Sequence, residues 1–335
     1  MKFVLLNDTR DQPHFGCSRV METIEQLIHA RGGTITGTCL TGTDWSKDVR
    51  FLENLSTSDA IIINGEGTLH HGASRGELLL QIVDHPIRQE KPVYLINCLY
   101  QENPQKWGDY INKIDLIMAR DSKSFHELSQ VYKTGVLLKG LDLSLYNEFN
   151  EDIPAARSCN VYGDSFYQDI TRQLIKLSDE DSTSISVPIC RYFKSTKPNL
   201  PWPLKEARII YLKINALSMK AKHPRLYYAK STSKYLQLIN RARFHLTGRF
   251  HGACLSLVTK TPFALTTSNS WKMEALIEDV GISRARLLNP SQLQGFISKG
   301  GAKNYSSSEC FSISTAIEEN RRIIDWIFDQ IVPQS

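Results

Sequence analysis

The chain has 335 residues and a formal net charge of +5, with 41% hydrophobic and 22% charged residues. This length exceeds one typical α/β domain and predicts two of about 150 residues each. The charge suits an anionic substrate or membrane surface, but no lysine-rich run indicates nucleic-acid binding. The seven cysteines have scattered spacings that give neither a disulfide framework nor a Cys-x-x-Cys metal pattern, and we predict no metal site.

The first half of the chain alternates apolar strand-like runs with amphipathic helix-like runs. This alternation predicts a parallel, doubly wound sheet whose ligand crevice lies at the carboxyl ends of the strands. The polar stretch 147–156 predicts a linker, so we place the first domain at residues 1–148. Strands are predicted at 3–6, 35–39, 60–64, 93–97, 115–118 and 136–138, with helices at 18–31 and 77–84.

The second half restarts the same alternation, and we place the second domain at residues 157–312. Residues 194–203 are rich in proline and lysine and predict an irregular loop, a candidate lid. The terminal segment 313–335 carries an amphipathic helix predicted at 315–331. Strands are predicted at 158–163, 184–188, 228–230, 244–247 and 264–265, with a helix at 168–177 and another starting near residue 234.

The most informative motif is Gly248-Arg249-Phe250-His251-Gly252, which follows a predicted strand and opens a predicted helix. A helix start attracts anions through unpaired N–H groups and the macrodipole. A guanidinium and an imidazole at that point predict a site for phosphate or carboxylate. Considered alone, Arg249 would be better interpreted as capping a neighbouring carbonyl, and His251 as a packing residue. The presence of both on one glycine turn favours a binding site.

The loop Gly65-Glu66-Gly67-Thr68 follows a predicted strand and should face the crevice. Glu66 could act as a general base or hold the loop by accepting backbone N–H bonds, and we weigh these equally.

Other residues near predicted strand ends are further candidates for the crevice. Asn7 and His14 follow the first strand, and His70 follows the glycine loop. His70 and His71 are adjacent on an expected helix and point in different directions, so we predict no shared metal. We expect Cys17 to be buried rather than nucleophilic.

The Gly248–Gly252 motif, with Lys260-Thr261-Pro262 and Lys272 after it, resembles the polysaccharide pyruvyl transferase family over residues 234–281. The resemblance implies two Rossmann-like domains in the arrangement of the B-type glycosyltransferases, with a donor cleft between them. It also implies that the terminal helix crosses back to the first domain.

The resemblance extends to Arg120-Asp121-Ser122-Lys123-Ser124, where it implies a ligand role for Arg120 and a helix cap at Asp121 or Ser124. Arg191 would complete the anion site. The sequence departs from the family in having Glu66 within the glycine run and His14-Phe15-Gly16-Cys17 where many members have Asn-x-Gly-Asp.

The implied reaction transfers a pyruvyl group from phosphoenolpyruvate to a sugar hydroxyl in surface polysaccharide assembly. Arg249, Lys272 and the Gly248 turn would bind the donor, His251 would be the acid and Glu66 the base. No cofactor is expected.

Two alternatives stay open. One is a glycosyltransferase of the same fold using a CMP-activated 2-keto sugar acid of the Kdo or sialic acid type. The other is a non-catalytic carbohydrate-binding relative.

The expected partners are a phosphorylated donor and a saccharide or lipid-linked glycan acceptor, without nucleic acid. The chain begins with a strand that reaches a turn within seven residues, and it has no apolar run of about 20 residues. We therefore expect a cytosolic protein, with peripheral association at the inner membrane face as an open alternative.

Overall fold

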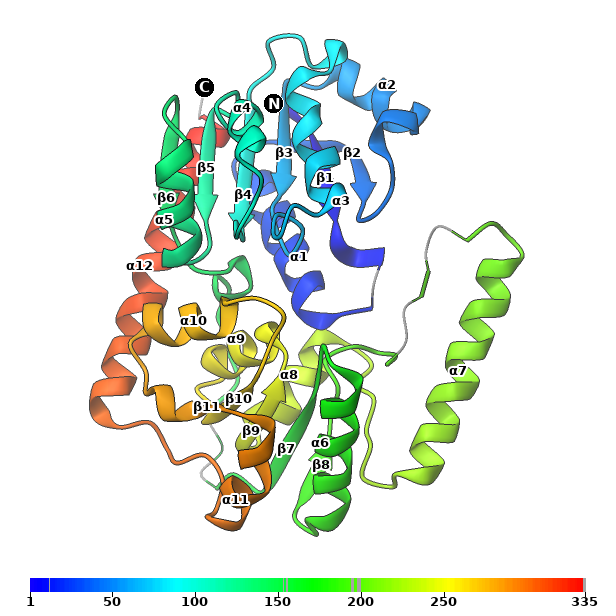
Figure 1. Ribbon diagram of the computed structural model, residues 1–335, viewed down its shortest axis with the longest axis vertical. Coiled ribbons are helices and arrows are strands. Elements are labelled where there is room, and N and C mark those ends of the chain that lie inside the picture. The colour runs from blue at the N-terminus through cyan, green and yellow to red at the C-terminus, as the bar shows by residue number, and fades with distance from the viewer. Residues whose placement is uncertain (12, 153, 155, 194–195, 198–199, 334–335) are drawn as a thin grey trace. The chain divides into compact units, whose positions relative to one another are not determined.

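The computed structural model describes all residues except 12, 153, 155, 194–195, 198–199 and 334–335, so parts of the predicted linker and of the predicted lid loop lie outside it. Contacts divide the chain into two units. Unit 1 comprises Met1–Asp11, Val20–Tyr146 and Ile317–Ser335, and unit 2 comprises Gln12–Arg19 and Asn147–Ala316. Each unit has its own parallel sheet flanked by helices (Figure 1), which confirms the predicted fold class.

The sheet of unit 1 has six strands in the order β2-β1-β3-β4-β5-β6, all parallel. The order reverses direction between β1 and β3, which makes their carboxyl ends the expected ligand position. The strands are β1 (Lys2–Asp8), β2 (Thr34–Leu40), β3 (Ala60–Asn64), β4 (Val93–Cys98), β5 (Leu116–Ala119) and β6 (Val136–Lys139).

Side chains of these strands alternate between two buried cores, because successive residues point to opposite faces. Val4 and Leu6 join the core under α2, α3 and α5, whereas Phe3 and Leu5 join the core under α1 and α12. Unit 1 is therefore covered on both faces. Its helices are the part of α1 (Phe15–Ala30) from Val20 onward, α2 (Val49–Thr57), α3 (Ser74–Leu80), α4 (Gly108–Ile111), α5 (Ser122–Val131) and the later part of α12 (Ser307–Ile331). The first turn of α1 belongs to unit 2.

The sheet of unit 2 has five parallel strands in the order β11-β10-β9-β7-β8, so its reversal point lies between β7 and β9. The strands are β7 (Cys159–Ser165), β8 (Ser184–Ser186), β9 (Ala242–Gly248), β10 (Phe263–Thr266) and β11 (Leu287–Leu288). The helices are α6 (Gln168–Glu180), α7 (Leu204–Lys222), α8 (Thr232–Asn240), α9 (Phe250–Val258), α10 (Lys272–Val280) and α11 (Leu293–Ser298).

The strand predicted at 228–230 is wrong. The chain makes one bridge to the sheet there, between Ser186 and Leu226, and then leaves it. Ser231 already caps α8 by accepting from the Lys234 amide, so too few residues remain for a ladder. The helix α7 was not predicted at all.

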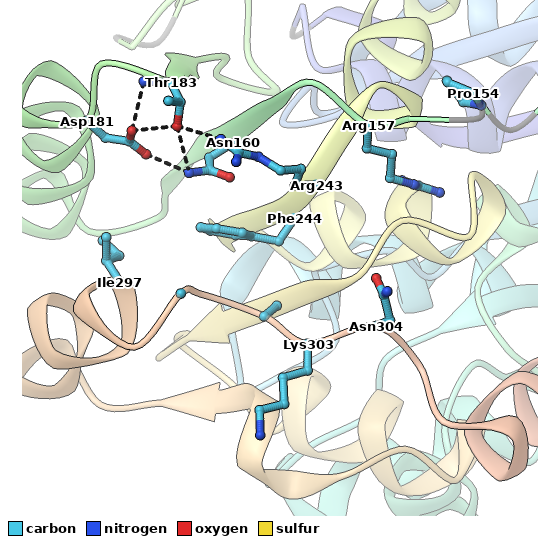
Figure 2. A pocket seen from close by; sticks show the side chains of 12 residues that line it. Pro154, Arg157, Asn160, Asp181, Thr183, Arg243, Phe244, Ile297, Lys303 and Asn304 are labelled. Carbon is cyan, nitrogen blue, oxygen red and sulfur yellow. Dashed lines mark hydrogen bonds between the residues drawn. The ribbon is translucent and has the colours of Figure 1, made fainter.

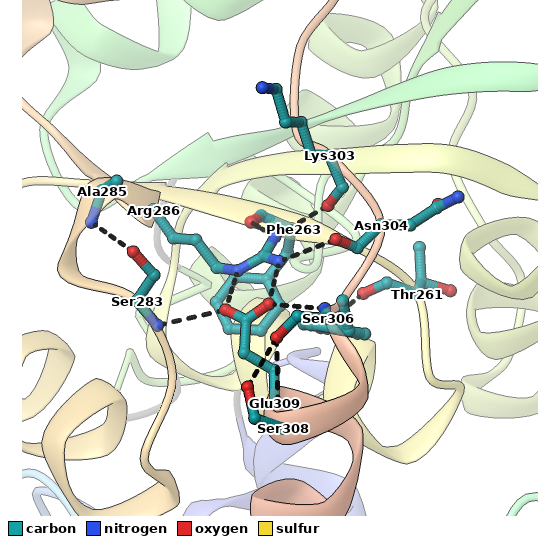
Figure 3. A network of polar contacts seen from close by, with 11 residues as sticks. Thr261, Phe263, Ser283, Ala285, Arg286, Lys303, Asn304, Ser306, Ser308 and Glu309 are labelled. Atoms are coloured by element: carbon teal, nitrogen blue, oxygen red, sulfur yellow. Dashed lines mark hydrogen bonds and ion pairs between the residues drawn. The ribbon is translucent and has the colours of Figure 1, made fainter.

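A polar network centred on Arg286, which directly precedes β11, ties the start of β10 to the start of α12 (Figure 3). The Arg286 guanidinium binds both carboxylate oxygens of Glu309, through Nε at 3.1 Å and Nη2 at 3.0 Å. Its Nη1 donates to the carbonyls of Phe263 and Lys303, and its carbon centre lies 4.5 Å from the Tyr305 ring centroid. Such forked, charge-assisted bonds hold two segments in one geometry.

We expect the stability of unit 2 to fall in acid through Glu309. Bonding to Arg286 lowers the pKa of Glu309 from 4.5 to about 2, against the effect of burial. Because the folded pKa is depressed, the stabilisation is present above 4.5 and is lost as the pH falls toward about 2. Urea unfolding across this range should show a loss of about 1 kcal/mol, after allowance for solvent screening, that Glu309→Gln lacks. Equal pH slopes in both proteins would contradict this assignment.

Candidate functional site

Arg249 stands between β9 and α9, where it is the N-cap residue of the helix. A Cβ on Gly248 would lie 2.6 Å from the Ser165 Cβ, so only glycine lets β9 end this close to β7. The start of α9 therefore lies at the reversal point of the unit 2 sheet, where ligands of such folds bind. The predicted strand, glycine turn and helix are confirmed here.

The Arg249 guanidinium is held by Asp164, the penultimate residue of β7, on the other side of the reversal point. Arg249 Nε donates to Asp164 Oδ2 at 2.7 Å, while Asp164 Oδ1 accepts from the Ile189 amide at 2.8 Å. Burial opposes the charge on Arg249, but Asp164 outweighs it and the pKa of Arg249 is raised. In the described part of the chain the ion pair uses only Nε, so the Nη fork is placed to bind an anion.

His251 lies in the first turn of α9 and is 5% exposed. Its ring packs against Gly16 in the first turn of α1, where an added Cβ would lie 2.2 Å from the His251 Cβ and Cγ. The His251 ring centroid is 5.2 Å from that of His14, in an edge-on arrangement. Residues far apart in sequence thus fix the imidazole beside Arg249.

We expect Gly16→Ala to reduce turnover by about 10- to 100-fold, because the new methyl group must displace the His251 ring. The matched control is Gly295→Ala, since a Cβ at Gly295 meets nothing within 4 Å. Steady-state kinetics and melting temperatures of both variants check this. An unchanged rate in Gly16→Ala would mean that the ring position is unimportant.

His14 is neutral at ordinary pH. Burial, followed by the charges of His251 and Arg249, lowers its pKa well below the usual histidine value. Its Nδ1 accepts from the Cys17 amide at 3.3 Å, so the ring proton is assigned to Nε2. A neutral donor in an electropositive setting suits an anionic ligand. His14 therefore remains a candidate for the site.

His14, Cys17 and His251 also form a group of potential metal ligands, with one ligand atom of each lying within 4.8 Å of the others. The sequence prediction of no metal did not foresee this grouping. The cations Arg249 and Lys272 lower the pKa of His14, and the same electrostatic field opposes a divalent cation.

We expect turnover to persist after treatment with a chelator and removal of the chelator by dialysis. The electrostatic field at His14 is the reason, and metal analysis together with kinetics is the measurement. A loss of turnover that zinc restores would instead identify the three side chains as a metal site.

Lys272 and Arg191 also belong to unit 2. Lys272 is the first residue of α10, and its Nζ donates to Asn269 Oδ1 at 2.9 Å. Its charge acts on His14, which places it in the same electropositive region. Arg191 is exposed, and its Nη2 donates to the Lys230 carbonyl at 2.7 Å.

Arg120 lies in unit 1, where its Nη1 is 3.1 Å from Asp142 Oδ2. Both side chains are almost completely buried. This ion pair supports a structural role for Arg120, and donor binding by it stays a prediction. The predicted cap at Asp121 is confirmed, because its Oδ1 accepts from the Ser124 amide at 2.7 Å.

The second candidate region lies at the reversal point of unit 1. Asn7 is the penultimate residue of β1, with a φ of 63°, and is 2% exposed. Its Nδ2 donates to the Asn64 carbonyl at 2.6 Å and to the Glu66 carbonyl and Thr68 Oγ1 at 3.3 Å each. Asn7 therefore positions the glycine loop.

Glu66 is 8% exposed in that loop, and its Oε2 accepts from Thr9 Oγ1 at 3.3 Å. Gly65 packs against the backbone of Cys98, where a Cβ would lie 2.7 Å from Cα, and Gly67 has a φ of +67°. Both glycines are thus required by the loop conformation. The loop presents Glu66 beside the carboxyl ends of β1 and β3.

The helix expected at His70 and His71 is wrong, because α3 begins only at Ser74. His70 instead makes a bridge with Gln101, and His71 has a φ of 54°. A tight turn after the glycine loop therefore separates these histidines from the helix.

A hollow of about 740 Å³ in unit 2 lies away from Arg249 (Figure 2). It includes Asn160 and Arg243, near the starts of β7 and β9, and so lies at the opposite edge of the sheet. Asp181 and Thr183 bond Asn160 there, and Thr183 also accepts from Arg243. Because ligands of such sheets bind at the carboxyl edge, we do not assign the function to this hollow.

Sequence reasoning missed Asp164 and Gly16. Asp164 could have been identified from the sequence, because it directly follows the strand predicted at 158–163. In this fold class, ligand-binding residues lie at the carboxyl ends of the strands. No local signal pairs Gly16 with His251, because their contact joins distant segments.

The fold resembles several solved structures. They include the S. aureus MnaA protein solved with UDP (11% identity over 100% of this chain and 98% of that chain, TM-score 0.53). Two others are the glycotransferase of kitacinnamycin (9% identity over 98% of each chain, TM-score 0.51) and the UDP-N-acetylglucosamine 2-epimerase of Rickettsia bellii (10% identity over 99% of this chain and 98% of that chain, TM-score 0.50). At these identities the likeness shows the fold alone, two Rossmann-like domains of the B-type glycosyltransferase kind. A comparison with curated proteins finds no match.

A family model described as polysaccharide pyruvyl transferase matches residues 15–270. The match covers most of the chain and includes the β9–α9 turn with Arg249 and His251. Together with the fold, it establishes that this chain belongs to the polysaccharide pyruvyl transferase family.

Proposed function

We propose that this protein transfers a pyruvyl group from phosphoenolpyruvate to a sugar hydroxyl in surface polysaccharide assembly. The observation that carries the proposal is the Arg249 guanidinium, fixed by Asp164 at the start of α9 with His251 beside it. The family and fold point to a transferase.

The charges of this region fit the two anionic groups of the donor. The helix start and the Arg249 fork suit a phosphate, and Lys272 in the same electropositive region suits a carboxylate. A neutral His14 can donate from Nε2 without adding a charge. Phosphoenolpyruvate carries both anions on one carbon.

The reaction needs a proton at C3 of the donor, and we assign the acid role to His251. As C3 is protonated, C2 becomes electron-poor and forms a bond with the first sugar oxygen. The C2–O bond to phosphate then breaks, and a second hydroxyl closes the ketal. In net terms, one hydroxyl proton ends on C3 and the other leaves with inorganic phosphate.

Glu66 is the proposed base that takes the proton of the attacking hydroxyl. Its carboxylate lies at the reversal point of unit 1 and is bonded by Thr9. Glu66→Gln should therefore lower kcat without weakening donor binding. The proposed acceptor is a saccharide or a lipid-linked glycan.

The testing experiment compares phosphoenolpyruvate, CMP and a CMP-sugar acid by thermal shift at matched ionic strength. Arg249→Lys keeps a charge against buried Asp164 but loses the fork, so it should stay folded and lose most of the shift. Stabilisation by phosphoenolpyruvate that Arg249→Lys loses is the expected result.

Two outcomes would overturn the proposal. Stabilisation by CMP compounds alone would indicate a glycosyltransferase of the same fold. No response to any of the three ligands would favour a non-catalytic carbohydrate-binding protein.

A further inference from the structure

The helix α7 (Leu204–Lys222), drawn in light green in Figure 1, has an apolar face that is exposed in the part of the chain that the structure describes. Leu212 is its only buried residue. Ile210, Ile214 and Leu217 are 57%, 61% and 69% exposed. Their spacing of four and three residues places them on one side of the helix, opposite Leu212. Such a stripe in a 19-residue helix indicates a contact with something outside the unit.

Basic side chains border one edge of this apolar face. At 100° per residue, Lys213 and Lys220 follow that edge, whereas Arg208 and Lys222 lie farther round the helix. With Lys205, the helix has five basic residues and one acidic residue, Glu206. The surface that covers this face should therefore be negatively charged.

Aromatic residues add to the same surface. Trp202, just before the helix, is 79% exposed, and Tyr211, beside the apolar face, is 42% exposed. The Arg208 guanidinium carbon lies 5.1 Å from the Tyr211 ring centroid. Tryptophan and tyrosine favour the boundary between lipid and water, where an apolar ring and a polar group are both accommodated.

We propose that α7 binds flat on an anionic phospholipid bilayer, with its apolar face among the upper acyl chains and its lysines at the headgroups. An interfacial helix has this combination of a leucine- and isoleucine-rich face, an aromatic anchor and a basic edge. Lysine stems can lie along the apolar region while the ammonium groups reach the phosphates. None of the helices in the described ranges has the length and hydropathy to cross a bilayer, so the contact is a surface one.

A second copy of α7 fits this face less well than a bilayer does. Lys213 lies at the middle of one edge of the stripe, so an antiparallel pair of helices centred on the stripe would bring the Lys213 ammonium groups of the two copies together. Anionic headgroups would instead neutralise Lys213 and Lys220. The charge pattern therefore favours lipid as the occupant.

The test is sedimentation of the full chain with vesicles of phosphatidylcholine alone or mixed with phosphatidylglycerol. The parent protein should bind only the mixed vesicles. The double variant Ile214→Ser/Leu217→Ser should bind at least about tenfold more weakly, and Lys213→Gln/Lys220→Gln about tenfold more weakly. The control Phe311→Ser, at a residue that is 73% exposed on α12, should bind like the parent.

The proposal is overturned if the parent protein ignores mixed vesicles, or if the two α7 variants bind as well as the control. It is also overturned if light scattering shows a dimer that the α7 variants convert to monomers. The thermal shift with phosphoenolpyruvate, measured without vesicles, should be the same in the parent and the α7 variants. Membrane binding and donor binding therefore fail or succeed separately.

Discussion

The His251→Asn variant is expected to transfer pyruvyl groups about 10²–10⁴ times more slowly than the parent protein while unfolding at nearly the same temperature. The imidazole is the proposed proton donor to C3, and asparagine cannot replace that function. Asparagine is smaller and polar, so it fits the space beside Gly16 without a clash. Steady-state kinetics with a saturating donor, together with thermal unfolding, provide the measurement.

His245 supplies a matched control on β9, six residues earlier in the same unit. It is fully buried, and its Nδ1 lies 2.8 Å from Ser256 Oγ, so it has a packing role. His245→Asn should lower the melting temperature and leave the rate per folded molecule unchanged. If His251→Asn behaves in the same way, His251 is structural and the assigned acid role is wrong.

The Arg120→Met variant is expected to lower the free energy of unfolding by about 3–5 kcal/mol. The guanidinium forms a buried ion pair with Asp142, and its removal takes one charge partner away from a buried carboxylate. Urea unfolding of the parent and the variant at neutral pH measures the difference.

The double variant Arg120→Met/Asp142→Asn should recover much of the lost stability, because both charges of the pair are removed together. Asparagine can also keep the cap that Asp142 provides to the Ser144 amide. If the stability loss in the double variant equals the sum of the losses in the two single variants, the two residues are not energetically coupled. A stable Arg120→Met protein that no longer responds to phosphoenolpyruvate would instead support the donor-binding prediction.

The sequence predicted the parallel sheets and the Arg249–His251 turn because both depend on local patterns. Buried parallel strands are continuous apolar runs, such as 60–64, and their alternation with amphipathic helices defines the fold class. A glycine between a strand and a helix marks the turn directly. The position of Arg249 at the start of α9 therefore followed from neighbouring residues alone.

Contacts between distant segments could not be predicted in this way. Arg249 pairs with Asp164, 85 residues away in the chain, and Arg120 pairs with Asp142, 22 residues away. Neither the apolar periodicity nor the glycine turn identifies these partners. The helix α7 was missed for a different physical reason. Its apolar stripe faces away from its own unit, and the preceding Pro201-Trp202-Pro203 indicated a loop.

The grouping of Gln12–Arg19 with unit 2 limits how genes of this family can recombine. A single crossover near residue 147 would transfer Asp164, Arg249 and His251 into a new background without Gly16, whose missing side chain leaves room for the His251 ring. An inherited alanine at position 16 would then displace the imported imidazole. Active hybrids should therefore be those that acquire both parts of unit 2, Gln12–Arg19 and Asn147–Ala316, from the same parent gene. The two segments should then share an ancestry although they are separated in the gene.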